Sequence, residues 1–98
     1  MKVRFHPEAV SELNNAVDYY EEQETGLGID FTKEIQKGIA MISKYPGSWQ
    51  QVSASTRRLI IKKIPYGLIY MRMDNTIFII AVMHLNRKPG YWKYRTHV

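Results

Sequence analysis

The segment 57–84 most constrains the fold of this chain, because it contains three apolar runs separated by two short turn signals. β-Branched and aromatic residues dominate the runs, and the turn signals are Pro65-Tyr66 and Asp74-Asn75. This spacing is typical of two consecutive hairpins. We therefore predict three antiparallel strands in one sheet.

A two-residue turn at Asp74-Asn75 also predicts the faces of the sheet. The strand pairs would be Met73 with Thr76, Met71 with Phe78 and Ile69 with Ile80. One face would then carry Ile69, Met71, Phe78, Ile80 and Val82, and the other Tyr70, Arg72, Ile77 and Ile79. The second face is less uniformly apolar, so we expect it to be concave and partly exposed. A slip of one residue would exchange the two faces.

Two amphipathic helices are predicted upstream of this sheet. Apolar residues at helical spacing indicate one helix from Pro7 to about residue 24 and another over 29–43. Gly26 is expected to cap the C-terminus of the first helix. Gly38 marks either a close approach of the second helix to its neighbour or a tolerated weak position. The i,i+4 carboxylates Glu8 and Glu12 are interpreted as part of a solvated helix face.

The element order predicts an α+β fold in a single domain, 1–98. The helices would form an N-terminal helical hairpin, packed on one face of a twisted antiparallel sheet. Segment 2–5 is expected to add a short edge strand, and segment 49–52 a short strand or an irregular segment.

Charge is distributed unevenly along the chain, whose formal net charge is +5. Residues 1–49 contain five bases and eight acids, whereas residues 50–98 contain nine bases and one acid. This asymmetry favours a polyanion or an acidic protein surface as partner, the alternative being a solvated face without a partner. The candidate nucleic-acid- or target-binding residues are Arg57, Arg58, Lys62, Lys63, Arg72, Arg87, Lys88, Lys93 and Arg95.

Several function classes are disfavoured by what the chain lacks. It has no cysteine, which excludes disulfides and thiolate metal sites, and makes a cytoplasmic location the expectation. The longest apolar run, 77–83, is far shorter than the about 20 residues that span a bilayer, and no signal peptide is recognised at the N-terminus. The scattered His6, His84 and His97 predict no metal site, and no cofactor is expected.

Several short motifs follow one another along nearly the whole chain: Ala9-Val10-Ser11-Glu12-Leu13, Tyr19-Tyr20-Glu21, Gly26-Leu27-Gly28 with Phe31, Tyr45-Pro46, Ile64-Pro65-Tyr66, Ala81-Val82-Met83-His84 and Arg87-Lys88-Pro89-Gly90-Tyr91-Trp92. Together they resemble the RelE/ParE superfamily of type II toxin–antitoxin toxins. The resemblance implies a small bacterial toxin that is silenced by a cognate antitoxin and that meets operator DNA only through that antitoxin.

The superfamily has two activities, and the resemblance favours its ParE-like branch. ParE-like members poison DNA gyrase without chemistry of their own, whereas RelE-like members cleave mRNA on the ribosome. Nuclease members usually carry an arginine where this chain has Gly67, and a glycine cannot stabilise a pentavalent phosphate. The alternatives are a RelE-like ribonuclease, whose candidate catalytic residues are His84, Arg87 and Tyr91, and a non-toxic module that binds only the antitoxin.

An antitoxin segment, as a helix plus an extended strand, is expected to wrap the domain. Candidate contacts are Leu13, Tyr20, Phe31 and, on the open sheet face, Tyr70. For Leu13 and Phe31 a role in the core is the favoured interpretation.

Overall fold

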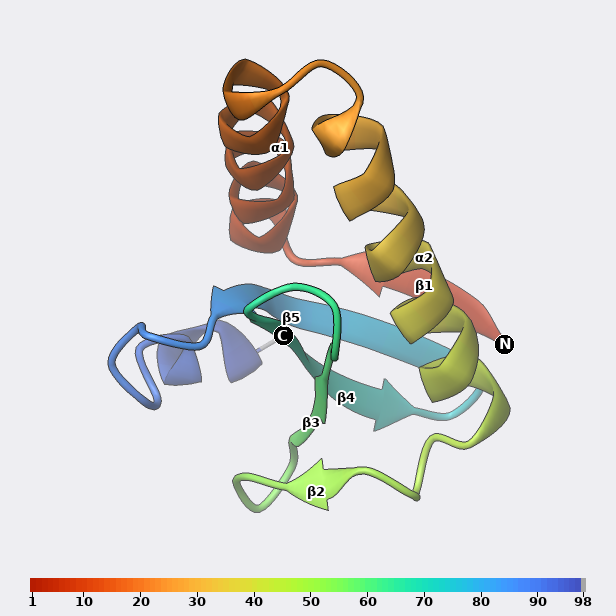
Figure 1. Ribbon diagram of the computed structural model, residues 1–98. Coiled ribbons are helices and arrows are strands. Elements are labelled where there is room, and N and C mark those ends of the chain that lie inside the picture. The colour runs from red at the N-terminus through yellow and green to blue at the C-terminus, as the bar shows by residue number, and fades with distance from the viewer. Residues whose placement is uncertain (98) are drawn as a thin grey trace.

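The computed structural model describes residues 1–97 (Figure 1). Its five strands form one sheet in the order β1-β5-β4-β3-β2, with two helices on one side. The elements are β1 (Lys2–Phe5), α1 (Pro7–Gln23), α2 (Leu27–Lys44), β2 (Gln50–Gln51), β3 (Arg57–Ile60), β4 (Tyr66–Met73), β5 (Thr76–His84) and the 3₁₀ helix η1 (Lys93–Thr96). The predicted α+β class is confirmed.

The three predicted strands are β3, β4 and β5, and they pair antiparallel as expected. The expected edge strand is β1, but it runs parallel to β5, so the sheet is mixed rather than purely antiparallel. The short strand expected near residue 50 is β2, which pairs with β3.

The predicted register is correct only in the half of the hairpin next to the turn. Met71 lies opposite Phe78 as expected, but Ile69 lies opposite Ala81 instead of Ile80. Ile80 is therefore an extra residue in β5, a β-bulge. Because the bulge consumes one residue, Ile80 and Ala81 join the same cluster, and Val82 moves to the helix-facing side.

The helix-facing side of the sheet holds the larger core. Its buried residues come from both helices, from β3, β4 and β5, and from the loop after β3: Ala9, Ala16, Phe31, Ile35, Ile42, Leu59, Ile61, Leu68, Tyr70, Ile77, Ile79 and Val82. The expectation that the Tyr70 side would be exposed is wrong, since Tyr70 is only 1% exposed. Its hydroxyl donates to the carbonyl of Pro46, which satisfies the one polar group that burial would penalise.

Local contacts explain where the helices begin. His6 caps α1, because its Nδ1 accepts a hydrogen bond from the Glu8 N–H at 3.1 Å. Gly26 has the left-handed φ of 96°, but it stands at the start of α2, so its predicted role as the C-cap of α1 is wrong. The Glu21 carboxylate accepts from the N–H groups of Gly26 and Gly28 at 3.0–3.1 Å and so occupies the N-terminus of α2.

Gly38 confirms the close approach that was one of its two interpretations. A Cβ at this position would lie 3.0 Å from Leu68 Cδ1 and 3.4 Å from Leu59 Cδ2. Both leucines are buried in the core, so α2 can lie this close to the sheet because residue 38 has no side chain.

The opposite side of the sheet carries a smaller cluster, formed by Ile69, Met71, Ile80, Ala81, Met83 and Trp92. Trp92 comes from the segment that follows β5, residues 85–97, which we call the tail. The tail therefore packs on the sheet side that the helices leave open. No helix within residues 1–97 is both long enough and apolar enough to cross a membrane.

Candidate functional site

A basic groove lies on the open side of the sheet, between the strands and the tail. Arg58 enters it from β3, and Arg87 and Lys93 enter it from the tail. Ile69, Met83 and Trp92 are among its apolar lining residues, and the groove measures about 370 Å³. Its lining residues include no carboxylate. A phosphate or an acidic side chain would therefore meet three cations there without competition.

Arg58 is held in the groove by its neighbours. Its Nη2 donates to Gln50 Oε1 at 3.0 Å, and its Cγ lies 3.5 Å from the position that a Cβ on Gly67 would take. Within residues 1–97, the buried Nε of Arg58 has no hydrogen-bond partner. Leaving this buried donor without a partner costs free energy, and the buried atom itself is not accessible to a ligand in the groove.

The tail turn presents the other two cations. Arg87 lies over the ring of Tyr91, with its guanidinium carbon 4.0 Å from the ring centroid. Gly90 has φ of 79°, which a residue with a side chain rarely adopts, and Lys93 Cε would lie 3.0 Å from any Cβ placed there. The Pro-Gly-Tyr-Trp motif thus shapes the turn that carries Arg87 and Lys93.

A polar cluster ties the tail to α1, and we call it the tail latch: Glu12, Tyr91 and Arg95. Arg95 donates to both oxygens of Glu12, at 2.8 and 3.1 Å, in a bidentate ion pair. The Tyr91 hydroxyl donates to Glu12 Oε2 at 2.6 Å. Arg95 is 5% exposed and the Glu12 side chain 16%, so this is a largely buried ion pair.

The tail latch also completes the edge of β5. The parallel pairing with β1 ends at Ile79, which leaves the following backbone groups on that edge without a strand partner. The Val82 N–H donates to Glu12 Oε1 at 3.0 Å, and Arg95 donates to the Ile80 carbonyl at 3.2 Å. Two side chains therefore replace the missing strand.

Both protonated partners of Glu12 keep their protons at neutral pH. Burial raises the pKa of Tyr91, and its hydrogen bond to Glu12 raises this pKa further. Burial lowers the pKa of Arg95, but its hydrogen bonds to Glu12 and Tyr94 and the Glu12 charge outweigh burial, so the net pKa is raised. Both donors to Glu12 are therefore protonated in the physiological pH range.

The nine cations predicted as one surface are divided by the fold. Arg57 and Arg72 line a separate depression beside Tyr70 and Pro46, and Lys62, Lys63 and Lys88 are exposed in loops. Arg95 is buried in the tail latch, so it is not exposed on the basic surface where it was predicted. In the part of the chain that the structure describes, Arg95 alone among the nine forms an ion pair.

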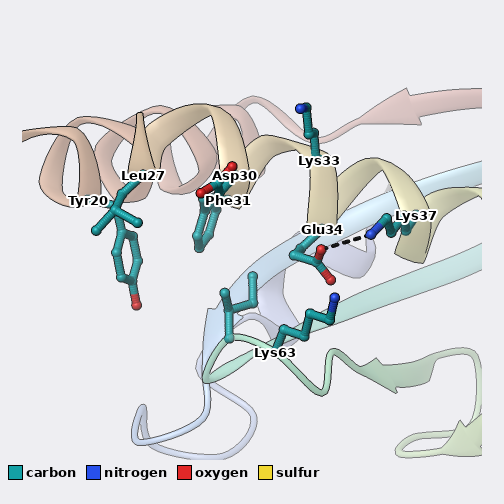
Figure 2. A pocket seen from close by; sticks show the side chains of 9 residues that line it. Tyr20, Leu27, Asp30, Phe31, Lys33, Glu34, Lys37 and Lys63 are labelled. Carbon is teal, nitrogen blue, oxygen red and sulfur yellow. Dashed lines mark hydrogen bonds and ion pairs between the residues drawn. The ribbon is translucent and has the colours of Figure 1, made fainter. Parts of the chain in front are cut away.

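A second hollow, the helix-side pocket, lies between the helical hairpin and the loop that joins β3 to β4 (Figure 2). Its apolar lining consists of Tyr20, Leu27, Phe31 and Ile64, and its volume is about 470 Å³. Tyr20 and Phe31 stack with ring centroids 5.1 Å apart. Charged lining residues surround this apolar part: Asp30, Lys33, Glu34, Lys37 and Lys63.

The predicted antitoxin contacts differ in how accessible they are. Tyr20 and Phe31 both line the helix-side pocket, although Phe31 is only 1% exposed and belongs mainly to the core. Leu13 is half-buried against the core, in line with its favoured interpretation. Tyr70 is buried beneath the helices, so its prediction as an exposed contact is wrong.

The candidate catalytic residues are used in local structure. His84 Nδ1 accepts a hydrogen bond from the Asn86 N–H at 3.0 Å, and its ring meets Tyr66 edge-on at 5.1 Å. His84 and Arg87 line one small cavity together with Tyr66. The Tyr91 hydroxyl donates a hydrogen bond to the Glu12 carboxylate. Among residues 1–97, no group of three or more potential ligands could hold a metal ion.

A match to a protein-family model shows which family the chain belongs to. The family model described as the ParE toxin of the type II toxin–antitoxin system parDE matches residues 3–89. The chain belongs to the ParE toxin family. This confirms the resemblance drawn from the sequence motifs, including its favoured branch, and makes the protein a type II toxin–antitoxin toxin.

A solved structure supports the ParE fold. The chain is similar to a chain described as the chromosomal ParDE TA system from P. aeruginosa, with a TM-score of 0.65 and 14% sequence identity. The similarity covers 86% of this chain and 95% of that one. At this identity the likeness shows the fold alone. No curated protein has a sequence that matches this chain.

Glu12 is the residue of this ParE-family toxin that sequence reasoning missed. It was assigned to a solvated helix face, whereas the structure places it against β5 and the tail. One signal was available: Glu12 lies three residues after Ala9 and four before Ala16, and both alanines are buried. A carboxylate in the small-residue stripe of a helix requires a partner, and that partner lies 83 residues away.

Proposed function

We propose that this ParE-family toxin acts by binding DNA gyrase through the basic groove, and that a cognate antitoxin neutralises it. The observation that carries this proposal is the groove itself, where three cations from β3 and the tail surround a lining without carboxylates. Such a surface suits binding to a charged macromolecule. It supplies charge and shape without a positioned acid–base pair.

The surroundings of the candidate catalytic residues favour binding over cleavage. Transesterification needs a group that accepts a proton near neutral pH. Tyr91 has a raised pKa and keeps its proton, with its hydroxyl donating a hydrogen bond to Glu12, and His84 uses Nδ1 to accept a hydrogen bond from the Asn86 N–H. Gly67 lies beneath Arg58 in place of the arginine of nuclease members.

A supercoiling and DNA-cleavage assay with purified gyrase tests the proposal. The wild-type toxin should inhibit supercoiling and accumulate cleaved DNA. Lys93→Gln should weaken inhibition, whereas Lys88→Gln should not, because Lys88 is an exposed tail cation that does not line the groove. Absence of inhibition by the wild type at large molar excess would remove gyrase as the target.

The ribonuclease alternative makes a different prediction. A RelE-like activity would cut mRNA in the ribosome, and primer extension on translated mRNA would show new ends that depend on His84 and Arg87. If neither assay responds and induction leaves growth unaffected, the chain is a non-toxic module that retains antitoxin binding.

The helix-side pocket is our proposed anchor for the antitoxin. Its apolar lining suits an apolar side chain of a helix or strand. Three lysines and two carboxylates complete the lining, and Lys37 is paired with Glu34, so a small excess of positive charge favours an acidic segment. In Figure 2, Tyr20 and Phe31 point into the pocket from the two helices, and Lys63 approaches from the opposite loop. The proposed occupant is an acidic antitoxin segment with an apolar anchor.

Adjacent lysines provide a matched test of this anchor. Lys63 lines the pocket and Lys62, also exposed, does not. Lys63→Glu should weaken copurification with the acidic protein encoded beside the toxin gene, whereas Lys62→Glu should not. Equal effects of the two reversals would indicate only a general charge attraction. In this proposal the pair is cytoplasmic and reaches operator DNA through the antitoxin.

A further inference from the structure

We propose that Glu12, on α1, is the positioning residue that holds Arg87 in the basic groove, acting through Tyr91. Glu12 does not itself line the groove. The importance of Arg87 for a target rests on the proposed function, but its placement by Glu12 is a property of the free protein and can be measured without a target.

The contacts form a short chain from helix to groove. Glu12 Oε2 accepts the Tyr91 hydroxyl at 2.6 Å, which fixes the far end of that ring. The Arg87 guanidinium carbon lies 4.0 Å from the centroid of the same ring. Arg95, held by both Glu12 oxygens, also faces this ring at 5.2 Å. The carboxylate therefore fixes the orientation of the ring, and the ring in turn holds the Arg87 guanidinium.

Beyond Arg87 the tail needs a side-chain anchor, because backbone hydrogen bonds hold only its start, from Leu85 to Pro65 and from Arg87 to His84. The backbone hydrogen bonds of Arg87, Tyr91, Lys93 and Arg95 go to carbonyls three residues earlier in the chain, at 2.9–3.3 Å. The Arg87 bond goes to His84, the last residue of β5, whereas the other three close local turns without tying residues 88–95 to the sheet. Side chains therefore dock this segment: Trp92 against the open side of the sheet, and the tail latch against α1 and β5.

Glu8 offers a matched control for Glu12. It lies one turn earlier on α1 and also approaches Arg95, with 3.6 Å between its Oε2 and Arg95 Nε, but it accepts its hydrogen bond from the Tyr94 hydroxyl. Glu8→Gln therefore perturbs the same tail without touching Tyr91. Tyr91→Phe keeps the ring beneath Arg87 and removes only its bond to Glu12.

The first readout is the contact between Arg87 and the Tyr91 ring, measured by NMR as the cross-peak from the Arg87 side-chain protons to the aromatic protons. Glu12→Gln should weaken or abolish this cross-peak, and Glu8→Gln should preserve it. Tyr91→Phe should weaken the cross-peak to the Phe ring at that position, and this variant keeps the test open if Glu12→Gln folds poorly. An unchanged cross-peak in both folded Glu12→Gln and Tyr91→Phe would overturn the proposal.

The second readout is binding of inorganic tripolyphosphate to the full-length toxin, measured by calorimetry. Arg87→Gln defines the loss of one charged contact, about tenfold in Kd. Glu12→Gln should approach this loss although it removes a negative charge, which by simple Coulomb attraction would tighten anion binding. Tighter binding by Glu12→Gln would contradict the proposal. If Arg87→Gln binds as well as the wild type, the groove assignment in the proposed function fails, and the NMR contact alone decides the positioning role.

Discussion

The two sides of the sheet are stabilised by different kinds of interaction. On the helix side, twelve buried residues pack in one apolar cluster. On the open side, six buried residues form a smaller cluster, and the tail is held there by Trp92 and by the tail latch. Apolar burial is proportional to area and tolerates small shifts, whereas a bidentate ion pair requires one geometry.

This difference separates folding from the placement of functional groups. The helix side determines whether the domain folds at all, because its cluster contains residues from both helices and three strands. The open side determines where Arg87 and Lys93 lie. A change on the open side can therefore alter the groove of this ParE-family toxin while the rest of the domain stays folded.

The largest expected effect comes from the helix side. Ile79 is fully buried there, so Ile79→Ala should lower the free energy of unfolding by about 4 kcal/mol. The measurement uses two variants that each retain a single tryptophan as the fluorescent probe. Trp49 packs on the helix-side cluster, and Trp92 belongs to the cluster on the open side. The midpoint of urea unfolding should shift equally for both probes. A shift seen by Trp49 alone would contradict the claim that the helix-side cluster determines folding of the whole domain.

A smaller effect is expected from the largest apolar anchor of the tail. Trp92→Ala should cost about 2 kcal/mol, less than the about 3–5 kcal/mol usual for a buried tryptophan. The cost is limited because the tail can detach instead of straining the sheet. Hydrogen exchange should rise in residues 85–97 and remain low in β4 and β5. Increased exchange throughout the sheet would show that the two sides are not separable.

The sequence predicted the elements well because each has its own period. Alternation and turn residues indicated β3, β4 and β5, and the helical spacing of apolar residues indicated α1 and α2 to within a few residues. The two faces were grouped correctly except for Val82, but the face expected to be partly exposed lies beneath the helices, because both faces are apolar enough to be buried. The bulge was missed because Ile80 suits either register, and periodicity carries no signal for one extra apolar residue.

The candidate site was less predictable because it depends on where the tail docks. The sequence identified the cations but could not show that Arg58, Arg87 and Lys93 share a groove, since loops and turns bring them together. The pairing of Arg95 with Glu12 spans nearly the whole chain, and no local pattern indicates it. The Pro-Gly-Tyr-Trp motif pointed to the right segment through resemblance, without revealing its contacts.

Alkaline pH should weaken the tail latch, because it removes the Tyr91 proton. The pKa of Tyr91 in the folded toxin lies above its unfolded value of about 10, so its contribution to stability is complete below pH about 10 and declines as pH rises toward the folded pKa. One group changes the free energy of unfolding by at most about 1.4 kcal/mol per pH unit. Between pH 9 and 11 the wild type should therefore lose up to about 1 kcal/mol more than Tyr91→Phe, measured by urea unfolding. Equal losses would mean that the Tyr91 hydroxyl has the same pKa in the folded and unfolded chains.

The smallest effect should come from a surface ion pair, which sharpens the contrast with the buried one. Lys37 donates to Glu34 at 3.1 Å on α2, but the Lys37 side chain is 66% exposed. Lys37→Ala should change the free energy of unfolding by about 0–0.5 kcal/mol, because water and salt screen an exposed pair. A loss above about 1 kcal/mol would mean that Lys37 packs its aliphatic stem on the pocket instead of acting as a charge.

Since Lys37 also lines the helix-side pocket, the same variant should still weaken antitoxin binding. An effect on binding without an effect on folding would mark the pocket rim as a recognition surface, in contrast to the tail latch, where a buried ion pair holds the tail against α1.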